Sequence, residues 1–350
     1  MKIGFLGAGP GVAALHLPTV RRLGEGFRVA HIADGGSGRA QALAEPVGAR
    51  WSSGDHELLT DPCVDAVAIC TPPSEHERQI LAAVAAGKHA IFCEKPLAVT
   101  REAAAAVVSA CREAGVILLV GTNHAHDPGW AQAREVLKQH GRPLQSIAVT
   151  LALPPNRRYH QVVYDGGPFP SPSRGRPNTG DPAVAAGIVQ QLLTGLAIHD
   201  FPAIRHFAPV LEHIQYARFV PPIGYAVGFK ASGVSVQLVL TMLPEGPDSL
   251  WRMTFSTADL RLDLDYPPPF VHAGSGAVTV HNGDGSVARF PQSLQDGYEA
   301  EWQLFGELMA GTCPVDYGQI LADALYPIDV ADAVFNTMFT EAQPSTGVHP

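Results

Sequence analysis

The sequence has little cysteine, and its cysteines form no metal-binding pattern. Five cysteines are scattered over 350 residues, and neither a CxxC pair nor an HExxH motif is present. An odd, scattered set argues against a disulfide framework, and the missing motifs argue against a structural zinc site. We therefore expect reduced core thiols in a cytoplasmic protein without a metal site.

Positive charge and long apolar runs are also scarce. The net charge is -9, which disfavours nucleic acid and anionic membrane as partners. No uninterrupted apolar run reaches about 18 residues, so we expect no transmembrane helix. A predicted strand begins at Lys2, which leaves no room for a signal peptide. With 46% hydrophobic and 16% charged residues, the chain has the composition of a globular enzyme that acts on a small molecule.

Residues 1–122 alternate short apolar runs with helical patterns. This alternation is typical of a parallel sheet with helices on both faces, so we predict an α/β, doubly wound Rossmann domain over 1–122. The predicted strands are Lys2–Leu6, Arg28–Ala33, Ala66–Cys70, Ala90–Cys93 and Val116–Val120, and the predicted helices are Ala13–Leu23, Gly38–Glu45, Ser74–Ala86 and Arg101–Ala114.

The pattern changes after about residue 123 into a series of alternating strands. We predict an α+β domain over 123–350 with one large, open, mostly antiparallel sheet, which binds substrate and forms oligomers. Its C-terminal helices are long enough to pack back on the first domain. Residues 153–182 lack periodicity and are either a functional flap or partly disordered. The predicted helices are Pro128–Gln139, 187–207, Glu299–Met309 and Ile320–Phe339 (kinked or restarted at Pro327), and the predicted strands are Ile147–Ala152, Ile214–Val220, Ala226–Ala231, Val234–Met242, Leu250–Ser256, Leu260–Leu264, Val278–His281 and Val287–Phe290.

A glycine-rich turn follows the first predicted strand. Its spacing, Gly7-x-Gly9-x-x-Val12, is that of a dinucleotide-binding turn whose third glycine is replaced. Glycine permits the tight turn and lets backbone N–H groups approach a pyrophosphate at the helix N-terminus. We therefore predict cofactor contacts from Gly7, Gly9, Pro10, Gly11 and Val12.

Asp34 ends the second predicted strand. A carboxylate there accepts the ribose hydroxyls and repels a 2′-phosphate, which favours NAD. Two alternatives stay open: Asp34 is a helix cap, or Ser37 and Arg39 hold a phosphate, in which case NADP is possible.

The segment after the third predicted strand offers further cofactor contacts. Thr71 donates one hydrogen bond, and Pro72 keeps the segment near the dinucleotide without needing an N–H partner. His76 lies on the first turn of the next helix, where it is either a cofactor-side residue or a helix-packing histidine.

The turn Glu94-Lys95-Pro96 follows the apolar predicted strand Ala90–Cys93. Ligands of open α/β sheets bind at this carboxyl edge. A lysine with a lowered pKa is a general acid/base, although a lysine that only binds ribose fits the same place. Pairing with Glu94 would keep Lys95 charged, so we expect Glu94 to point to the ribose instead.

Several motifs together resemble the Gfo/Idh/MocA oxidoreductases. They are GAGPG from Gly7 with His16 behind it, CTPPSEHE from Cys70, GKHAIFCEKPLA from Gly87, GTNHAHDPGW from Gly121 and LAIHDF from Leu196. They occur in the family's order along nearly the whole chain. The resemblance implies a Rossmann domain, a second domain with an open antiparallel sheet, and homodimers or homotetramers. It also implies NAD(P)-linked oxidation or reduction of a sugar, sugar derivative or cyclitol.

The resemblance also assigns roles to single residues. Lys95 falls on the catalytic lysine, and Glu94 on the acid that contacts the nicotinamide ribose. Asn123 falls near the nicotinamide, and His199 on the histidine that shares the catalytic site.

The chain departs from the family pattern at three positions. Gly195 stands where the family frequently has an aspartate, and Ala125 stands where an arginine is common. Pro202 replaces a second acid, while Asp200 lies beside His199.

His199 is expected on helix 187–207, with Asp200 or a water behind it, although a satisfied core histidine is the alternative. His124 and His126 are expected on one side of an extended segment, and His124 is the candidate for substrate contact.

Three functions remain open. The first is an NAD(P)-dependent sugar or cyclitol dehydrogenase or ketoreductase with Lys95 as acid/base. The second is a protein with bound NAD whose net reaction is not redox (elimination, epimerisation or glycoside hydrolysis) or whose cofactor is regulatory. The third is a catalytically silent interaction protein.

Overall fold

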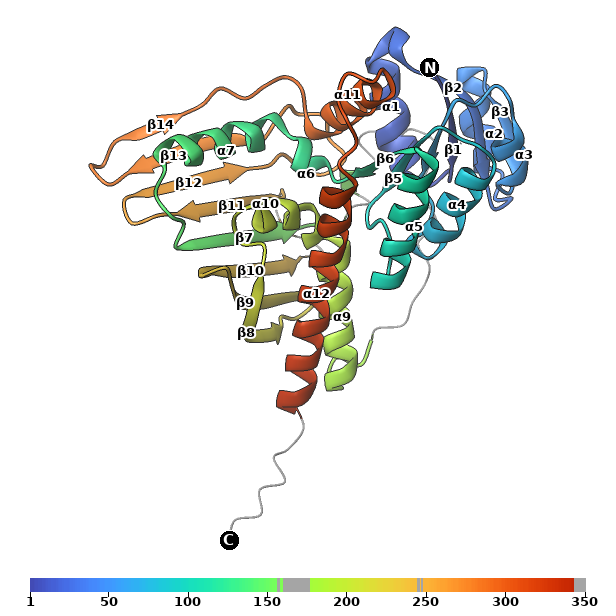
Figure 1. Cartoon of the computed structure of the whole chain (residues 1–350). Helices are drawn as coiled ribbons and strands as arrows, with labels where there is room; N and C mark the ends of the chain where they lie inside the picture. Colours follow the sequence, from blue (N-terminus) through green and yellow to red (C-terminus); the bar gives the residue numbers. More distant parts are fainter. Residues whose placement is uncertain (156–157, 160–176, 244–245, 247, 343–350) are drawn as a thin grey trace.

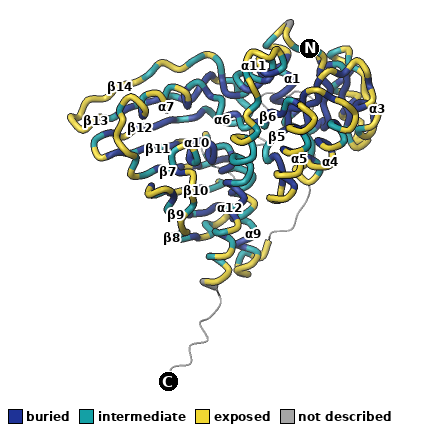
Figure 2. The backbone as a smooth tube through the Cα atoms, viewed as in Figure 1, coloured by how far each residue is buried: buried dark blue, intermediate teal, exposed yellow. Residues whose placement is uncertain are grey.

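The first part of the chain forms one parallel six-stranded sheet. The computed structural model describes residues 1–155, 158–159, 177–243, 246 and 248–342 (Figure 1). The strand order is β3-β2-β1-β4-β5-β6, the doubly wound order in which ligands bind at the reversal beside β1. Apart from the edge strand β3, these strands are mostly buried among their helices (Figure 2). The strands are β1 (Lys2–Leu6), β2 (Arg28–Asp34), β3 (Arg50–Ser53), β4 (Ala66–Ile69), β5 (Ala90–Glu94) and β6 (Ile117–Gly121).

The helices of this part lie on both faces of the sheet. The helix α5 was predicted to the residue because Thr100 caps its N-terminus and Gly115 ends it in the left-handed conformation. The first predicted helix is instead a π-helical turn followed by a short α-helix. The helical segments are η1 (Val12–His16), α1 (Leu17–Arg22), η2 (Gly24–Gly26), α2 (Arg39–Ala44), η3 (Glu45–Val47), α3 (His56–Thr60), α4 (Pro73–Ala85) and α5 (Arg101–Ala114).

The second part forms an eight-stranded mixed sheet. Its order is β14-β13-β12-β11-β7-β10-β9-β8, and only the β7–β10 pair is parallel among these strands. The predicted α/β fold with a second, mostly antiparallel open sheet is therefore confirmed. The strands are β7 (Ser146–Leu153), β8 (Leu211–Phe219), β9 (Gly224–Ala231), β10 (Val234–Met242), β11 (Leu250–Ser256), β12 (Leu260–Asp265), β13 (Ala277–Asn282) and β14 (Val287–Arg289).

Helices cover one face of the second sheet (Figure 1). The long helix α12 is continuous through Pro327, where we expected a kink or restart. It packs on both parts of the chain: Ile320 and Leu321 lie against the core of the first sheet, and Tyr326 and Val330 lie in the core of the second. These helical segments are α6 (Asn123–His126), α7 (Pro128–His140), α9 (Pro182–Gly195), η4 (Ala197–His199), α10 (Phe201–Phe207), α11 (Gly297–Met309) and α12 (Tyr317–Ala342).

Three local predictions were wrong. Strand β3 and helix α3 were missed because β3 is a short, mostly exposed edge strand without apolar alternation. The expected helix 187–207 starts earlier and is broken into α9, η4 and α10, since α9 ends at Gly195 and Pro202 fits only the first turn of a new helix. The expected extended segment at 123–126 is one turn of helix, α6.

One stretch, Pro182–His199, is long and apolar enough to cross a membrane when judged by those two properties alone. This corrects the expectation that no segment reaches that length. In the structure the stretch forms α9 and η4, which supply Val189, Leu193 and Ala197 to the core of the second sheet.

Candidate functional site

A cleft lies over the carboxyl ends of β1, β2 and β4, and we call it the dinucleotide cleft. It encloses about 1180 Å³, and the predicted residues Gly7, Gly9, Pro10 and Gly11 line it. Gly7 has a φ of 108°, and a Cβ atom there would lie 2.5 Å from the carbonyl oxygen of Cys70. A Cβ on Gly9 or Gly11 would meet no protein atom within 4 Å. The turn therefore packs tightly against the end of β4 at Gly7, while Gly9 and Gly11 leave space on its cleft side. A pyrophosphate needs this close approach to the backbone.

Val12, also predicted to contact the cofactor, does not line this cleft. Its side chain is 1% exposed and lies in the core beneath the turn. Here it begins the π-helical turn η1. The third position of the glycine motif is thus used for packing.

Asp34 lies in the cleft and also holds its own loop. Its carboxylate accepts hydrogen bonds from the N–H groups of Gly36 (2.8 Å), Ser37 (3.2 Å) and Ala40 (3.3 Å), and from the Ser37 hydroxyl. Burial opposes ionisation, but these bonds outweigh it and lower the pKa of Asp34. The carboxylate therefore binds its own loop and the first turn of α2, and its contact with a ribose stays a prediction.

Thr71 and Pro72 line the cleft as expected, and His76 does not. The His76 ring is fully buried, with Nδ1 2.8 Å from the carbonyl oxygen of Pro96 and Nε2 2.9 Å from that of Thr71. The packing interpretation of His76 is the one the structure supports. The ring ties the Thr71 segment to the Glu94-Lys95-Pro96 turn.

Glu94 ends β5 and accepts a hydrogen bond from a buried histidine. His16 Nε2 lies 2.7 Å from Glu94 Oε1, and the Trp302 N–H donates to His16 Nδ1 at 3.2 Å. Since Nδ1 accepts, the proton lies on Nε2 and is donated to Glu94. Burial opposes ionisation, but the bond from His16 and the Lys95 charge lower the pKa of Glu94.

Lys95 does not pair with the Glu94 carboxylate. Its ammonium donates to the carbonyl oxygen of Gly195 at 2.8 Å, at the C-terminal end of α9. Burial lowers the pKa of Lys95, and the Glu94 charge only partly offsets this. The lysine thus has the lowered pKa that proton transfer needs.

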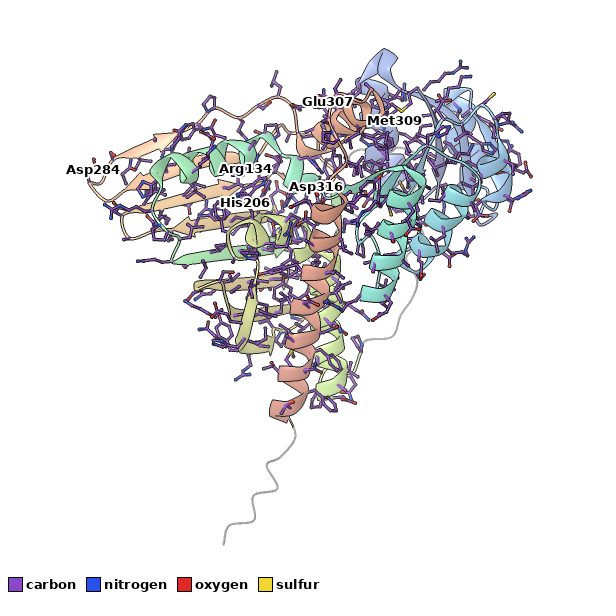
Figure 3. All side chains as sticks on the ribbon, viewed as in Figure 1. Arg134, His206, Asp284, Glu307, Met309 and Asp316 are labelled. Atoms are coloured by element: carbon purple, nitrogen blue, oxygen red, sulfur yellow. The ribbon has the colours of Figure 1, made fainter. Side chains whose placement is uncertain are left out.

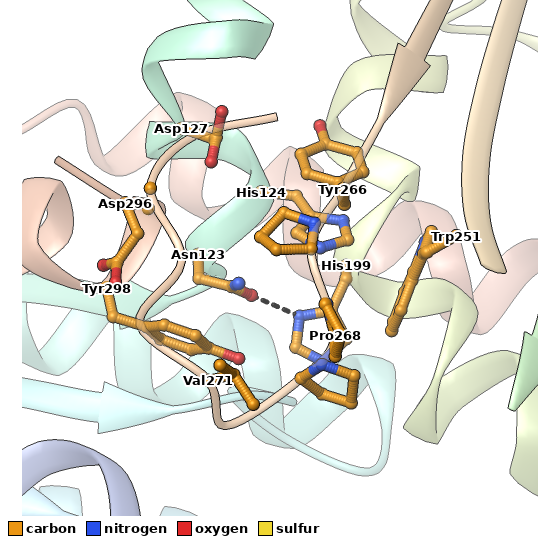
Figure 4. A pocket seen from close by; sticks show the side chains of 14 residues that line it. Asn123, His124, Asp127, His199, Trp251, Tyr266, Pro268, Val271, Asp296 and Tyr298 are labelled. Carbon is orange, nitrogen blue, oxygen red and sulfur yellow. Dashed lines mark hydrogen bonds between the residues drawn. The ribbon is translucent and has the colours of Figure 1, made fainter. Parts of the chain in front are cut away.

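A second cavity, which we call the histidine pocket, lies where α6 and η4 meet (Figure 4). His199 Nδ1 lies 2.6 Å from Oδ1 of Asn123, so Nδ1 carries the proton and Nε2 has a free lone pair. Burial, then the Lys95 and His124 charges, put the pKa of His199 well below its usual value. His199 is therefore neutral at physiological pH and accepts at Nε2.

His124 and Asp200 form a buried pair behind His199. His124 Nδ1 lies 3.1 Å from Asp200 Oδ1, and the Trp251 N–H donates to both oxygens of Asp200 at 3.0 and 3.1 Å. Tyr266 stacks on the His124 ring at 3.6 Å. Asp200 therefore orients His124, whereas we had expected it behind His199. His126 does not line the histidine pocket, so the expected shared orientation of His124 and His126 was wrong.

The sequence analysis missed most of the pocket wall. The missed lining residues are Asp127, Trp251, Tyr266, Pro267, Pro268, Pro269, Val271, Gly274, Asp296, Gly297 and Tyr298. We had interpreted Trp251 as a core residue. The Pro267-Pro268-Pro269 run was the one visible sign of an unusual segment. In the part of the chain that the structure describes, no group of three His, Cys, Asp or Glu side chains could hold a metal ion.

Comparison with known proteins agrees with this geometry. Residues 1–122 match the Gfo/Idh/MocA family model, described as an oxidoreductase family with an NAD-binding Rossmann fold. The chain is 41% identical over 139 residues to inositol 2-dehydrogenase 2 of Saccharopolyspora erythraea and 38% identical over 148 residues to inositol 2-dehydrogenase of Paracoccus denitrificans. These alignments cover 39% and 41% of this chain and 40% and 44% of the two relatives, so the chain spans less than half of their length.

The fold match extends over almost the whole chain. KijD10, a 3-ketoreductase from Actinomadura kijaniata solved with NADP and TDP-benzene, superimposes with a TM-score of 0.74 at 22% identity. The match covers 96% of this chain and 97% of that one. The glycine turn, the Glu94-Lys95-Pro96 turn and the family match lead to one assignment. Residues 1–122 of the chain carry the NAD-binding Rossmann fold of the Gfo/Idh/MocA oxidoreductase family.

Proposed function

We propose that the chain is an NAD(P)-dependent oxidoreductase that acts on a hydroxyl or ketone of a sugar, sugar derivative or cyclitol, with Lys95 as acid/base and His199 assisting. One observation carries the proposal: the Lys95 side chain is partly buried, its ammonium bonds to the Gly195 carbonyl and not to Glu94, and it lies close enough to His199 to lower the pKa of that histidine. A lysine with a purely structural role is expected to pair with a carboxylate, which would keep its charge.

The residues divide the chemistry between them. The cofactor supplies the hydride acceptor or donor at nicotinamide C4. In oxidation, the neutral amine of Lys95 takes the hydroxyl proton as the C–H hydride leaves, and in reduction the ammonium returns it. Asn123 fixes the His199 tautomer, so Nε2 accepts a hydrogen bond from the substrate hydroxyl or from Lys95.

The histidine pocket suits a polyhydroxylated ring. It combines polar groups (Asn123, His124 and the Tyr298 hydroxyl) with the flat faces of Trp251 and Tyr266. We accordingly assign cofactor binding to residues 1–122, and substrate binding and self-association to 123–350. Alternate positions of β7 and β10, such as Thr150 and Val239, leave one face of the second sheet open for a second copy. We also infer a cytoplasmic homo-oligomer.

Gly195 supports a second candidate, a net non-redox reaction with retained cofactor. The lysine has a backbone carbonyl as its partner at the place where the family frequently has an aspartate. A carbonyl cannot relay a proton, whereas an aspartate can.

The deciding experiment is absorbance at 340 nm with purified protein, NAD or NADP, and a panel of inositols, aldoses, uronates and amino sugars. We expect a signal with one substrate class, and Lys95→Met should lower kcat by about 10²–10⁴-fold. Exposed Lys138→Met is the matched control. Full activity in Lys95→Met would contradict the proposal. Substrate loss with no net change at 340 nm and a cofactor that stays bound would favour the second candidate.

A further inference from the structure

Glu301 on α11 has a carboxyl group without a hydrogen-bond partner in the protein interior. The residue is 0% exposed, and neither of its oxygens has a partner within the described part of the chain. An unpaired buried polar group costs stability, and a buried charge costs more, so such a group calls for an explanation. Trp302, the next residue on α11, and Phe305, one turn further on, lie in the apolar core, and packing alone gives no reason for a carboxyl group beside them.

The position of Glu301 connects the two parts of the site. Glu301 lies one helical turn after Tyr298, which lines the histidine pocket, and directly before Trp302. The Trp302 N–H donates to His16, which in turn bonds to Glu94 at the end of β5. A cofactor that extends from the cleft to Lys95 must bring its nicotinamide end past these groups.

The charges around Glu301 are mostly negative. Glu94 is ionised and bonded to His16, and Asp296 is paired with His272 (2.6 Å) and Arg22 (3.7 Å). His16, His272 and Arg22 are each engaged with Glu94 or Asp296, and none of them bonds to Glu301. Burial, then the charges of Glu94 and Asp296, raise the pKa of Glu301 well above its usual value. A fully buried carboxyl group without a hydrogen-bond partner favours its neutral form, so Glu301 holds its proton when no cofactor is bound.

We propose that Glu301 responds to the charge of the nicotinamide ring: it loses its proton when the oxidised cofactor binds and keeps it when the reduced cofactor binds. The oxidised ring is a cation, and the reduced ring is neutral. Binding of the cation leaves Glu301 as a carboxylate and releases one proton to solvent. Binding of the reduced form releases none. This inference rests on the proposed cofactor site but not on any substrate reaction.

The consequence is a pH-dependent preference between the two cofactor forms. Binding of the oxidised cofactor releases a proton, so a rise in pH strengthens it. Relative to the dissociation constant of the reduced cofactor, that of the oxidised cofactor should fall by up to about tenfold for each unit that the pH rises. This difference should extend over the pH range in which free Glu301 is protonated.

The test is calorimetric titration of NAD⁺ and NADH into the full chain at pH 7.0, in phosphate and in Tris. The two buffers take up protons with different enthalpies, so the difference in heat counts the protons released. We expect about one proton per site for NAD⁺ and none for NADH. Glu301→Gln should abolish the release and weaken NAD⁺ binding about tenfold, with NADH binding unchanged.

Two further variants keep the result interpretable. Glu301→Met fills the same space without a proton and should behave as Glu301→Gln does. Glu307→Gln, on the exposed side of the same helix (Figure 3), should behave as wild type. Equal proton release for NAD⁺ and NADH, or release that persists in Glu301→Gln, would overturn this inference alone. Failure of both cofactors to bind would overturn it together with the proposed function.

Discussion

The dinucleotide cleft and the histidine pocket are neighbouring cavities built in opposite ways. The cleft is formed by backbone at the ends of adjacent parallel strands, and its key residue, Gly7, acts through the absence of a side chain. The pocket is formed by side chains from separate segments, among them Asn123, His199, Trp251 and Tyr266. Adding one carbon atom to the backbone-built cleft should therefore weaken cofactor binding. In the pocket, which is built from side chains, removing one hydrogen-bonding group should lower activity.

The largest expected effect is on the cleft. Gly7→Ala forces a Cβ atom to 2.5 Å from the carbonyl oxygen of Cys70 at a φ of 108°. The combined strain and overpacking of about 3 kcal/mol should weaken cofactor binding by about a hundredfold or more, measured by fluorescence titration. Gly87→Ala is the matched control, because Gly87 has a φ of 71° but open space around its Cβ position. Equal losses in both variants would show that backbone strain alone is responsible.

A change in the histidine pocket should leave cofactor binding intact. His199→Gln removes the Nε2 lone pair, which stays free because Nδ1 donates to Asn123. We expect kcat to fall by about a hundredfold with the dissociation constant of the cofactor unchanged. His206→Gln on α10, an exposed histidine labelled in Figure 3, should retain full activity. A parallel loss of cofactor binding would contradict the separation of the two cavities.

A smaller effect is expected at the far end of the cleft. Asp34→Ala removes the carboxylate that favours ribose hydroxyls over a 2′-phosphate, so NAD affinity should fall about tenfold and NADP affinity should not fall. Ser37→Ala removes one loop bond but keeps the charge. If both variants lower NAD and NADP binding equally, Asp34 serves the loop and not the cofactor.

The smallest effect is a pH dependence of stability that arises in the pocket. Because burial holds the pKa of folded His199 well below 6.5, the unfolded chain takes up the proton first as the pH falls. Stability is therefore lost below pH 6.5, by up to about 1.4 kcal/mol per pH unit from this group. Urea denaturation at pH 7.5 and 5.5 should show a smaller loss in His199→Gln than in wild type. Identical losses would mean that folded His199 titrates normally.

The same contrast explains what the sequence could predict. The glycine turn, Asp34, Thr71, Pro72 and Lys95 lie at fixed places after strands, so local patterns were enough to find them. The wall formed by Trp251 and Tyr266 was not found, because these residues meet His124 only after the second sheet has folded. Val12 and His76 show the converse, since each lies inside a cofactor-binding motif but packs into the core.

The sequence analysis also could not find the partners of the charged residues. That Lys95 bonds to the Gly195 carbonyl, 100 residues away, depends on where α9 ends relative to β5. Likewise, the Trp302–His16–Glu94 chain joins the two ends of the protein. Hydrogen bonds between distant segments leave no periodicity in a sequence.

The contribution of α11 and α12 to the first sheet has a consequence for synthesis on the ribosome. Trp302, Phe305 and Leu308 lie in the core on one face of this sheet, and Ile320 and Leu321 pack against the core of the other. Nascent domains usually fold from the N-terminus as they emerge. Here the domain formed by residues 1–122 lacks part of its core until α11 and α12 have been made. The dinucleotide cleft therefore forms on a complete core only after these helices emerge, and a nascent chain stalled before them would expose the apolar surface that they cover.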